Sequence, residues 1–407
     1  MSGPLSGVKV LELSTFVAAP VCGRLLADLG AEVIKVEHPS GDAWRKTGVS
    51  YLPAYFSEQE NPVFDIYNSG KRHISINLKS PEGMEAFHKL LAQSDVLITN
   101  TRPAALARLG LSYDDLKDKY PSLIYGIILG YGEKGPDKDK PAFDTTAFWS
   151  RSGFLRDMAV KQDGYIPTLP PYSVGDTVTG YLLLSQICAA LYRKKETGKG
   201  DYVRAGLFHN AIFSMGTMQI ITQKPFGYVY PMPRQDNSVP GGYYECADGE
   251  WVFIATAYAE ALIPTLCEAI GQPELMDDPR FADWQGRWKN RKEYYEIFRE
   301  AFLKRPSTEW LEIAEKMDFP MMRMGHFSEL PDDEQAWANG YLEHVTFANG
   351  RTEVMPRSPI EMDSVGELVT KPAPCIGAQT DEILKELGYG DDEISALCAN
   401  GAVVSGK

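Results

Sequence analysis

The residue that best suits a chemical reaction is Asp176, in the segment Gly-Asp-Thr-Val-Thr-Gly at residues 175–180. It stands just before an apolar segment at residues 181–192, a pattern that predicts a helix start. Free backbone N–H groups and the helix dipole stabilise negative charge there. We therefore expect Asp176 to be ionised at neutral pH, able to act as a nucleophile without a general base. The simpler alternative is an ordinary N-cap, because Asp is among the preferred capping residues.

Composition limits the partners that such a site could serve. The 407 residues carry a formal net charge of −14, and 44% of them are hydrophobic and 24% charged. These values are typical of a globular protein with a large core, and the length favours two domains. The acidic balance argues against a nucleic-acid partner, which requires a basic surface. An anionic ligand would need a local cationic site, for which the candidates in the first third of the chain are Lys71, Arg72, Lys79, Arg102 and Arg108.

Cysteine and histidine are too dispersed to indicate a metal centre or a disulfide framework. The six cysteines include no C-x-x-C pair and form no ligand-like cluster with the six histidines. The sequence opens without a signal-peptide pattern, and we find no run of about 18 apolar residues. We predict a cytoplasmic protein with reduced cysteines and no bound metal.

The elements that would position Asp176 follow an alternation of strands and helices. Residues 8–13 and 33–36 indicate buried strands on either side of a helix at residues 20–30, with further elements at residues 74–78, 81–93, 95–99, 123–129 and 202–207. This order predicts an α/β protein with a doubly wound parallel sheet of Rossmann-like type. The turn after the first strand lacks G-x-G-x-x-G, so a nicotinamide or flavin cofactor is disfavoured.

A smaller α+β unit is expected after a segment rich in Pro, Tyr and Gly. It begins with a hairpin at residues 243–254 and continues with helices to about residue 317. We assign residues 1–205 and 345–407 to a large Rossmann-like domain, residues 206–240 to a linker and residues 241–344 to the small domain. A further amphipathic helix, interrupted near Gly388 and Gly390, is expected at residues 380–397.

Three separated blocks, taken together, resemble the class III CoA-transferases, the CaiB/BaiF family. The first spans residues 5–37 and includes Leu-Ala-Asp-Leu-Gly-Ala-Glu-Val-Ile-Lys at residues 26–35. The second is Asn-Ser-Gly-Lys-Arg at residues 68–72, and the third is the Gly-Asp segment followed by Thr-Gly-Lys-Gly at residues 197–200. The resemblance extends over nearly the whole chain, although each block alone is a weak signal.

The resemblance implies an interlocked homodimer that uses an acyl-CoA and a small carboxylic acid as substrates, with CoA as a substrate and no tightly bound cofactor. It implies that Asp176 is the catalytic aspartate. The positions that contact CoA in the family fall on Thr15, Phe16, Val17, Ala18, Ile76, Lys79, Asn100 and Arg108. Lys79 and Arg108 suit phosphate groups, and the main chain at Val17 suits the pantetheine arm. Without the resemblance, both cations would be interpreted as solvated side chains.

The family mechanism implies an aspartyl–acyl anhydride followed by an enzyme–CoA thioester. An α-methylacyl-CoA racemase is the main alternative, but those racemases carry His-Asp where this chain has Phe143-Asp144, and Phe143 cannot transfer a proton. A non-catalytic acyl-CoA-binding protein would have no need of Asp176. A nucleotide-dependent oxidoreductase is weakened by the missing glycine fingerprint. A formyl-, carnitine- or bile-acid-type CoA-transferase also stays open.

Two further segments resemble one branch of the family. Residues 130–149 and 334–339 are similar to the 2-hydroxyacyl-CoA transferases of anaerobic amino-acid fermenters. This implies exchange of CoA with a 2-hydroxy acid of the phenyllactate or 2-hydroxyisocaproate type. Phe148 and Trp149 would then offer aromatic walls to the acyl group, although aromatic residues at such junctions are more often part of the core. The family's Gly-Glu-His-Thr is replaced by Gly-Ala-Gln-Thr at residues 377–380, so contacts made by that Glu or His are lost or replaced.

Overall fold

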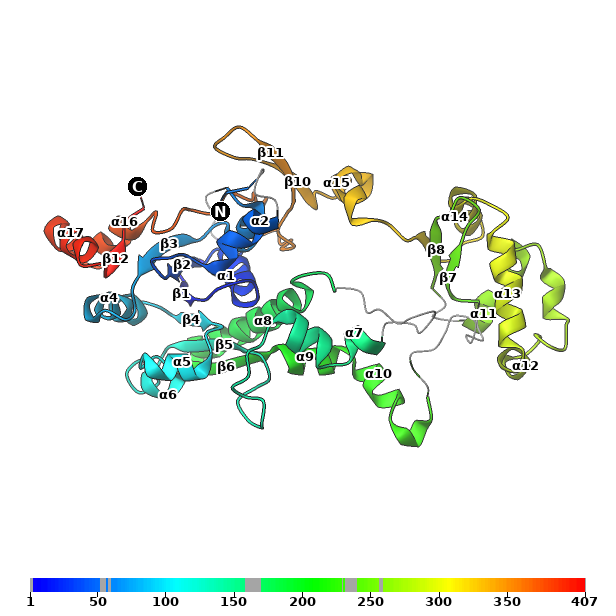
Figure 1. Ribbon diagram of the computed structural model, residues 1–407, viewed down its shortest axis with the longest axis horizontal. Helices are drawn as coiled ribbons and strands as arrows, with labels where there is room; N and C mark the ends of the chain where they lie inside the picture. Colours follow the sequence, from blue (N-terminus) through cyan, green and yellow to red (C-terminus); the bar gives the residue numbers. More distant parts are fainter. Residues whose placement is uncertain are drawn as a thin grey trace. The chain divides into compact units, whose positions relative to one another are not determined.

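The computed structural model describes residues 3–51, 56–57, 60–157, 170–228, 230, 240–255 and 259–406. The chain forms two compact units, the first from residues 1–155, 169–219 and 331–407 and the second from residues 156–168 and 220–330 (Figure 1). Residues 206–219 and 331–344 thus belong to the first unit and not to the linker and the small domain predicted from the sequence. Helix α9 (Leu207–Ser214) accounts for part of this difference, because its Leu207 and Ala211 are buried in the core of the first unit.

The first unit contains a seven-stranded sheet with the order β12-β3-β2-β1-β4-β5-β6. All neighbouring strands are parallel except β12, which pairs antiparallel with β3. The order 3-2-1-4-5-6 is that of a doubly wound Rossmann sheet. The predicted α/β class is therefore confirmed. The strands are β1 (Lys9–Leu13), β2 (Glu32–Glu37), β3 (Arg72–Ile76), β4 (Val96–Thr99), β5 (Ile124–Leu129), β6 (Asp201–Gly206) and β12 (Val403–Val404).

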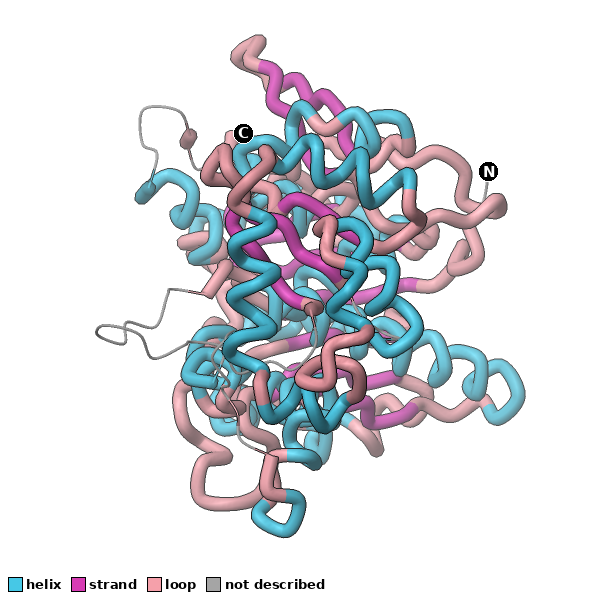
Figure 2. Tube along the Cα trace, turned by 90° about the vertical axis from the view of Figure 1, so that its right-hand side faces the viewer, coloured by secondary structure: helices cyan, strands magenta, loops and turns pink. Residues whose placement is uncertain are grey.

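Helices cover both faces of this sheet (Figure 2). Alternate residues of each strand face opposite sides, so that Val10 of β1 contributes to one core and Leu11 to the other. One face is covered by α1 (Ala18–Asp28), α8 (Val174–Thr197) and α9, and the other by α4 (Pro81–Ala92), α5 (Pro103–Arg108), α6 (Tyr113–Leu116), α16 (Thr380–Glu386) and α17 (Asp391–Ala399).

Shorter elements complete the first unit. A two-stranded antiparallel hairpin, β10 (Leu342–Thr346) and β11 (Thr352–Pro356), was not predicted from the sequence. The segment that follows β5 ends in a π-helical turn, η2 (Asp144–Ser150). The other short elements of this unit are η1 (Ala43–Lys46), α2 (Thr47–Tyr51), α3 (Pro62–Asn68) and α15 (Glu334–Ala338). The helix η3 (Lys224–Phe226) belongs to the second unit, and α7 (Phe154–Asp157), α10 (Gly216–Ile221) and η6 (Phe327–Asp332) each cross a boundary between the units.

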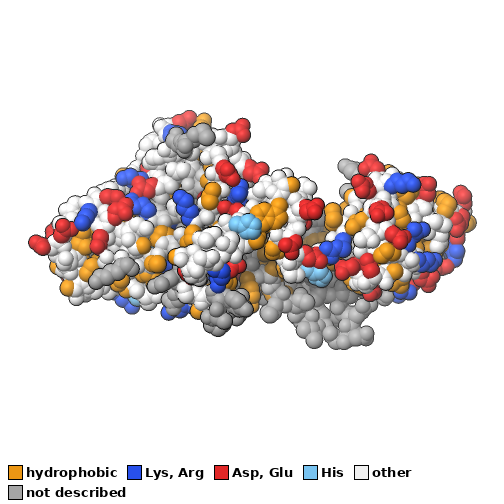
Figure 3. Space-filling model, turned by 90° about the horizontal axis from the view of Figure 1, so that it is seen from above, with side chains coloured by type: hydrophobic (Ala, Val, Ile, Leu, Met, Phe, Trp, Pro, Cys, Tyr) orange, Lys and Arg blue, Asp and Glu red, His pale blue; other side chains and the backbone are white. Residues whose placement is uncertain are grey.

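The second unit has its own aromatic-rich core around Phe298, Phe302 and Trp310. The predicted hairpin is present as β7 (Gly242–Glu245) and β8 (Trp251–Ile254), extended by β9 (Met321–Arg323) into a three-stranded antiparallel sheet. The helices expected before residue 317 are α11 (Ala259–Ala269), η5 (Pro273–Met276), α12 (Trp284–Lys289), α13 (Arg291–Phe302) and α14 (Ser307–Lys316). On the face seen in Figure 3, basic side chains are interspersed with acidic ones on both units.

Helix α8 is the central helix of the first unit. Among the helices that the structure describes, it alone has the length and apolar composition of a membrane-crossing segment, although no such run was expected from the sequence. Its Leu183 and Ile187 are fully buried against the sheet, and it packs along α1. The apolar character of α8 therefore serves the core of this unit, and its first turn lies where Asp176 is needed.

Candidate active site

A cavity of about 320 Å³ opens at the carboxyl ends of β1, β4 and β5. In doubly wound sheets this edge is where ligands bind, because the loops that follow the parallel strands meet there. Five of the predicted site residues line the cavity: Thr15, Phe16, Ala18, Asn100 and Asp176. The structure thus brings together the turn after β1, the residue after β4 and the first turn of α8.

The turn between β1 and α1 is held in an unusual backbone conformation. Phe16 has φ of 62°, in the left-handed region that non-glycine residues rarely adopt. Asn100 fixes the turn from one side, accepting a hydrogen bond from Thr15 N (3.1 Å) and donating one to Thr15 O (2.6 Å). Asp42, which follows β2, accepts a hydrogen bond from Phe16 N at 3.1 Å. Strained conformations persist only when their surroundings enforce them, and Asn100 and Asp42 supply that enforcement here.

Below this turn lies a buried cluster of four charged side chains, which we call the Lys35 cluster: Glu12, Lys35, Asp42 and Lys71. Lys35 Nζ lies 3.0 Å from Glu12 Oε1 and 3.0 Å from Asp42 Oδ2, and Lys71 Nζ lies 2.7 Å from Glu12 Oε2. Burial opposes the charge on Lys35, but Glu12 and Asp42 outweigh it and raise its pKa. Two ammonium groups and two carboxylates compensate one another.

Two cations that were candidates for an anionic ligand are engaged elsewhere. Lys71 is buried inside the Lys35 cluster and paired with Glu12, and burial lowers its pKa to about 8. Arg72 pairs with three carboxylates, Glu32, Glu382 and Glu386. Both candidates are engaged by acidic partners on strands and helices whose proximity the sequence did not reveal.

Asp176 is the third residue of α8, and Ser173, not Asp176, occupies the N-cap position. The side chain is half-buried. Burial, together with the nearby charge of Asp144, raises the pKa of Asp176 to about 7. The expectation of a fully ionised carboxylate at neutral pH was therefore wrong. The helix start does not offset the loss of water and the second carboxylate.

Asp144, at the start of η2, packs directly against the first turn of α8. Its side chain is 5% exposed, and Oδ2 accepts a hydrogen bond from Trp149 Nε1 at 3.2 Å. Burial raises the pKa of Asp144, while the Trp149 indole and backbone N–H groups of the α8 first turn act in the opposite direction. A Cβ atom on Gly175 would lie 2.2 Å from Asp144 Oδ1 and 2.3 Å from Phe148 Cγ. Glycine before Asp176 is required by this close approach.

Aromatic side chains define the wall of the cavity beside Asp144. Phe143 is 53% exposed and meets Phe16 edge-on, with ring centroids 5.3 Å apart. Phe148 is instead buried in the core of the first unit, so it does not provide the acyl wall considered from the sequence. Phe143 contributes an apolar surface and no proton-transfer group.

The other predicted CoA contacts lie outside this cavity. Val17 packs its side chain against Val21 and Leu25, which leaves only its main chain for a ligand. Ile76, at the end of β3, is 1% exposed. Lys79, just after β3, and Arg108, in the last turn of α5, are exposed. Roles for these four residues stay predictions.

Two cations that line the cavity were missed as site residues, Lys138 and Lys140, and a third, Arg102, had been noted only as a candidate cation. Lys140 also pairs with Asp137 at 2.5 Å. The signal that could have identified them is the lysine-rich segment at residues 134–140, where three lysines lie within seven residues. The cavity thus has cationic side chains at one part of its wall and Asp176 at another. Among the described residues, no three His, Cys, Asp or Glu side chains are grouped to hold a metal ion.

Comparison with known proteins gives this geometry a family. The model of CoA-transferase family III matches residues 5–380. The chain belongs to CoA-transferase family III. It is 41% identical to the (R)-2-hydroxy-4-methylpentanoate CoA-transferase of Clostridioides difficile, over 96% of this chain and 97% of that protein. It is 38% identical to the cinnamoyl-CoA:phenyllactate CoA-transferase of Clostridium sporogenes, over 96% of this chain and 95% of that protein.

Solved structures agree with the assignment of this family III member. A crystal structure of Rv3272 from Mycobacterium tuberculosis superposes with a TM-score of 0.80 at 26% identity, covering 94% of this chain and 99% of that one. A CAIB/BAIF family protein from Brucella suis superposes with a TM-score of 0.78 at 27% identity, covering 95% and 100%. The family expected from the sequence blocks is therefore confirmed.

Proposed function

We propose that the protein transfers CoA from an acyl-CoA to a 2-hydroxy acid of the phenyllactate or 2-hydroxy-4-methylpentanoate type, with Asp176 as the nucleophile. The observation that carries the proposal is the position of Asp176 in a cavity that also contains Arg102, Lys138 and Lys140. Cationic side chains suit the phosphates of CoA, and a carboxylate suits attack on a thioester. The two relatives at 41% and 38% identity carry names of this activity.

The reaction proceeds by four acyl transfers at one carboxylate. Asp176 attacks the thioester carbonyl of the donor, forming a mixed anhydride and releasing CoA thiolate. The thiolate attacks the Asp176 carbonyl carbon, which releases the donor acid and leaves an aspartyl–CoA thioester. The acceptor carboxylate attacks this thioester, giving a second anhydride and thiolate. The thiolate then attacks the acceptor carbonyl, which forms the new acyl-CoA and restores Asp176.

The raised pKa of Asp176 suits this role. A carboxylate with a pKa of about 7 is more basic than an exposed aspartate, and is about half-ionised at neutral pH. Catalytic groups work best when their pKa lies near the operating pH.

The CoA moiety would lie along the carboxyl edge of the sheet. We assign its contacts to Thr15, Phe16, Ala18 and Asn100 in the cavity, to the main chain at Val17 and Ile76, and to Lys79 and Arg108 at the phosphates.

A homodimer is proposed because large aromatic side chains such as Tyr192 and Phe213 are 71% and 83% exposed on α8 and α9. We place the enzyme in the cytoplasm, where acyl-CoA and free acids meet.

The decisive experiment compares the wild-type protein with Asp176→Ala. The wild type should exchange CoA between cinnamoyl-CoA and phenyllactate, or between a 4-methylpent-2-enoyl-CoA and 2-hydroxy-4-methylpentanoate. The variant should lose at least about 1,000-fold in kcat while CoA binding and the fold persist. Hydroxylamine added during turnover should trap a hydroxamate at Asp176, located by peptide mass mapping. An active Asp176→Ala variant would exclude this mechanism.

The racemase alternative predicts a different product. A racemase needs acid and base groups on both sides of the α-carbon, and Phe143 offers none beside Asp176. Incubation with a 2-methylacyl-CoA in deuterated water should therefore leave the α-carbon without deuterium. Rapid deuteration without CoA exchange would favour the racemase.

A further inference from the structure

A second cavity, of about 620 Å³, lies on the other side of the first turn of α8. It is formed within the first unit by η1, α3, the residues before α8 and β11 (Val354 to Pro356). Its walls include Trp44, Phe56, Val63, Ile66 and Met355. Cavities of this size and apolar character are typical of small-molecule sites.

This cavity reaches the reaction centre through Tyr67 and Ser173, both of which line it. The Tyr67 hydroxyl is hydrogen-bonded to Ser173 and Thr177, and burial, with a contribution from the Asp176 charge, raises the pKa of Tyr67. Ser173 is the N-cap of α8, three residues before Asp176, which is less than one helical turn. Trp44 also meets Phe16 of the first cavity edge-on, with centroids 6.1 Å apart. The second cavity therefore meets the first turn of α8 at Ser173 and Tyr67, close enough to Asp176 for its charge to act on the Tyr67 hydroxyl.

The two cavities differ in charge. The first is lined by Arg102, Lys138 and Lys140, whereas none of the described residues that line the second is charged. The polar side-chain groups in its lining are hydroxyls, including those of Thr47, Tyr67 and Ser173, and the Trp44 indole N–H, which donates to Val63 O. A buried carboxylate of a ligand would find no cation here, and an unpaired buried charge is strongly disfavoured.

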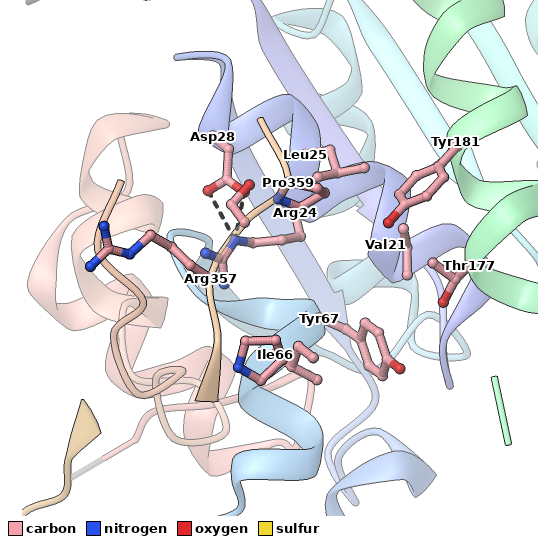
Figure 4. A pocket seen from close by; sticks show the side chains of 12 residues that line it. Val21, Arg24, Leu25, Asp28, Ile66, Tyr67, Thr177, Tyr181, Arg357 and Pro359 are labelled. Carbon is pink, nitrogen blue, oxygen red and sulfur yellow. Dashed lines mark hydrogen bonds and ion pairs between the residues drawn. The ribbon is translucent and has the colours of Figure 1, made fainter. Parts of the chain in front are cut away.

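Two arginines do line a smaller pocket that shares Ile66, Tyr67 and Pro356 with the second cavity. Their charges are already compensated: Arg24 pairs with Asp28 at 2.8 Å, and Arg357 pairs with Glu367 at 3.1 Å. Both guanidinium groups point away from the Tyr67 hydroxyl (Figure 4). They are not placed to receive a second carboxylate from a ligand beside Asp176.

We propose that the second cavity holds the acyl side chain of the substrate, and that it selects neutral branched or aromatic chains against acyl groups that carry a second carboxylate. The inference rests on the proposed function and deepens it. CoA then occupies the cationic cavity, the acyl chain occupies the neutral one, and the thioester carbonyl lies between them at Asp176.

The test uses Val63→Trp, which fills the second cavity from α3. The backbone oxygen of Val63 accepts the Trp44 indole N–H at 2.9 Å, and this bond survives a side-chain change. The matched control is Val369→Trp, because Val369 is 59% exposed and does not line the cavity. With 4-methylpentanoyl-CoA and 3-phenylpropanoyl-CoA, Val63→Trp should lower kcat/KM at least about tenfold, with little change for propionyl-CoA. The control should match the wild type.

A binding experiment separates this inference from the proposed function. The Asp176→Ala protein, which cannot form the anhydride, should bind 4-methylpentanoyl-CoA about 100-fold or more tightly than succinyl-CoA in titration calorimetry. Adding Val63→Trp should remove that preference. If the fold of Val63→Trp fails, Val63→Ala should instead extend activity toward bulkier chains.

The acyl-site assignment and the proposed function are contradicted by different results. Uniform loss with all acyl chains in Val63→Trp, or equal binding of succinyl-CoA, would overturn the acyl-site assignment while leaving CoA transfer intact. The stated binding preference in a wild-type protein that exchanges no CoA would support the cavity and refute the proposed function.

Discussion

Two groups of buried carboxylates lie within the first unit, and they differ in compensation. In the Lys35 cluster, Glu12 and Asp42 are paired with Lys35 and Lys71 at 2.7–3.0 Å. Burial raises the pKa of both Asp144 and Asp176 instead, and the Asp144 charge adds to the effect at Asp176, whose pKa reaches about 7. Compensated charges hold the backbone of the β1–α1 turn in place, whereas an uncompensated carboxylate is reactive. The difference shows how one sheet edge provides both a rigid frame and a nucleophile.

The largest effect on stability should come from removing a buried cation of the Lys35 cluster. Lys35→Met leaves Glu12 and Asp42 with one ammonium group between them, and the free energy of unfolding should fall by about 3–5 kcal/mol in urea titrations. Lys194→Met is the matched control, because Lys194 pairs with Asp95 at 2.7 Å but closer to solvent; its loss should be much smaller. Equal losses in both variants would show that the buried cluster is no more than an ordinary set of ion pairs.

A smaller effect of opposite sign is expected from Asp176→Asn. The pKa of Asp176 is about 7 in the folded chain and 3.8 for an ordinary aspartate, so its ionisation destabilises the fold as pH rises from about 4 to 7. The variant should match the wild type at pH 4 and exceed it above pH 7, by at most about 4 kcal/mol. Thermal unfolding at pH 4 and pH 8 measures this difference. A pH-independent difference would mean that Asp176 is not strained by burial.

Asp144→Asn tests how much the neighbouring carboxylate contributes to the raised pKa of Asp176. The Asp144 charge is the second cause of the raised pKa of Asp176, after burial. Removing this charge should move the acidic limb of the kcat/KM profile to lower pH. The limb should stay above the pKa of an exposed aspartate, because the burial of Asp176 remains. The profile is measured between pH 4 and 9 with a saturating acceptor acid. An unmoved limb would mean that Asp144 is uncharged in the free enzyme.

The smallest effect is expected from cations that are not buried. Lys138→Ala and Lys140→Ala should each raise the KM for acyl-CoA roughly 3- to 10-fold with little change in kcat, since a solvated charge contributes modestly. The difference from wild type should shrink in high salt. Lys134→Ala, in the same segment but not lining the cavity, should behave as the wild type. A lowered kcat in place of a raised KM would assign these lysines to the reacting groups.

The sequence predicted the parts of the fold that depend on local pattern. Alternating apolar segments were sufficient for the strands β1, β2, β4 and β5 and for helix α1. The strand expected at residues 74–78 ends at Ile76, and the one expected at residues 202–207 ends at Gly206, because helices and turns compete at strand ends. The strand β12 has two residues, Val403 and Val404, and so carries too little pattern to predict.

The sequence predicted site residues that belong to a motif, but not the properties that depend on charges brought together by the fold. Asp176 was identified from its glycine and the apolar helix that follows. Its pKa was not predictable, because Asp144 lies 32 residues earlier and meets it only after η2 packs on α8. The burial of the candidate cation Lys71 was not predictable for the same reason: its partner Glu12 lies far earlier in the chain, on β1.

The antiparallel pairing of β12 with β3 has a consequence for how the chain folds during its synthesis. The hydrogen-bonding edge of β3 is completed by Val403 and Val404, some 330 residues after β3 itself. Until those residues leave the ribosome, β3 is an open edge strand, and such strands invite pairing with other chains. Chaperone binding to nascent chains should therefore persist until Val403 and Val404 emerge.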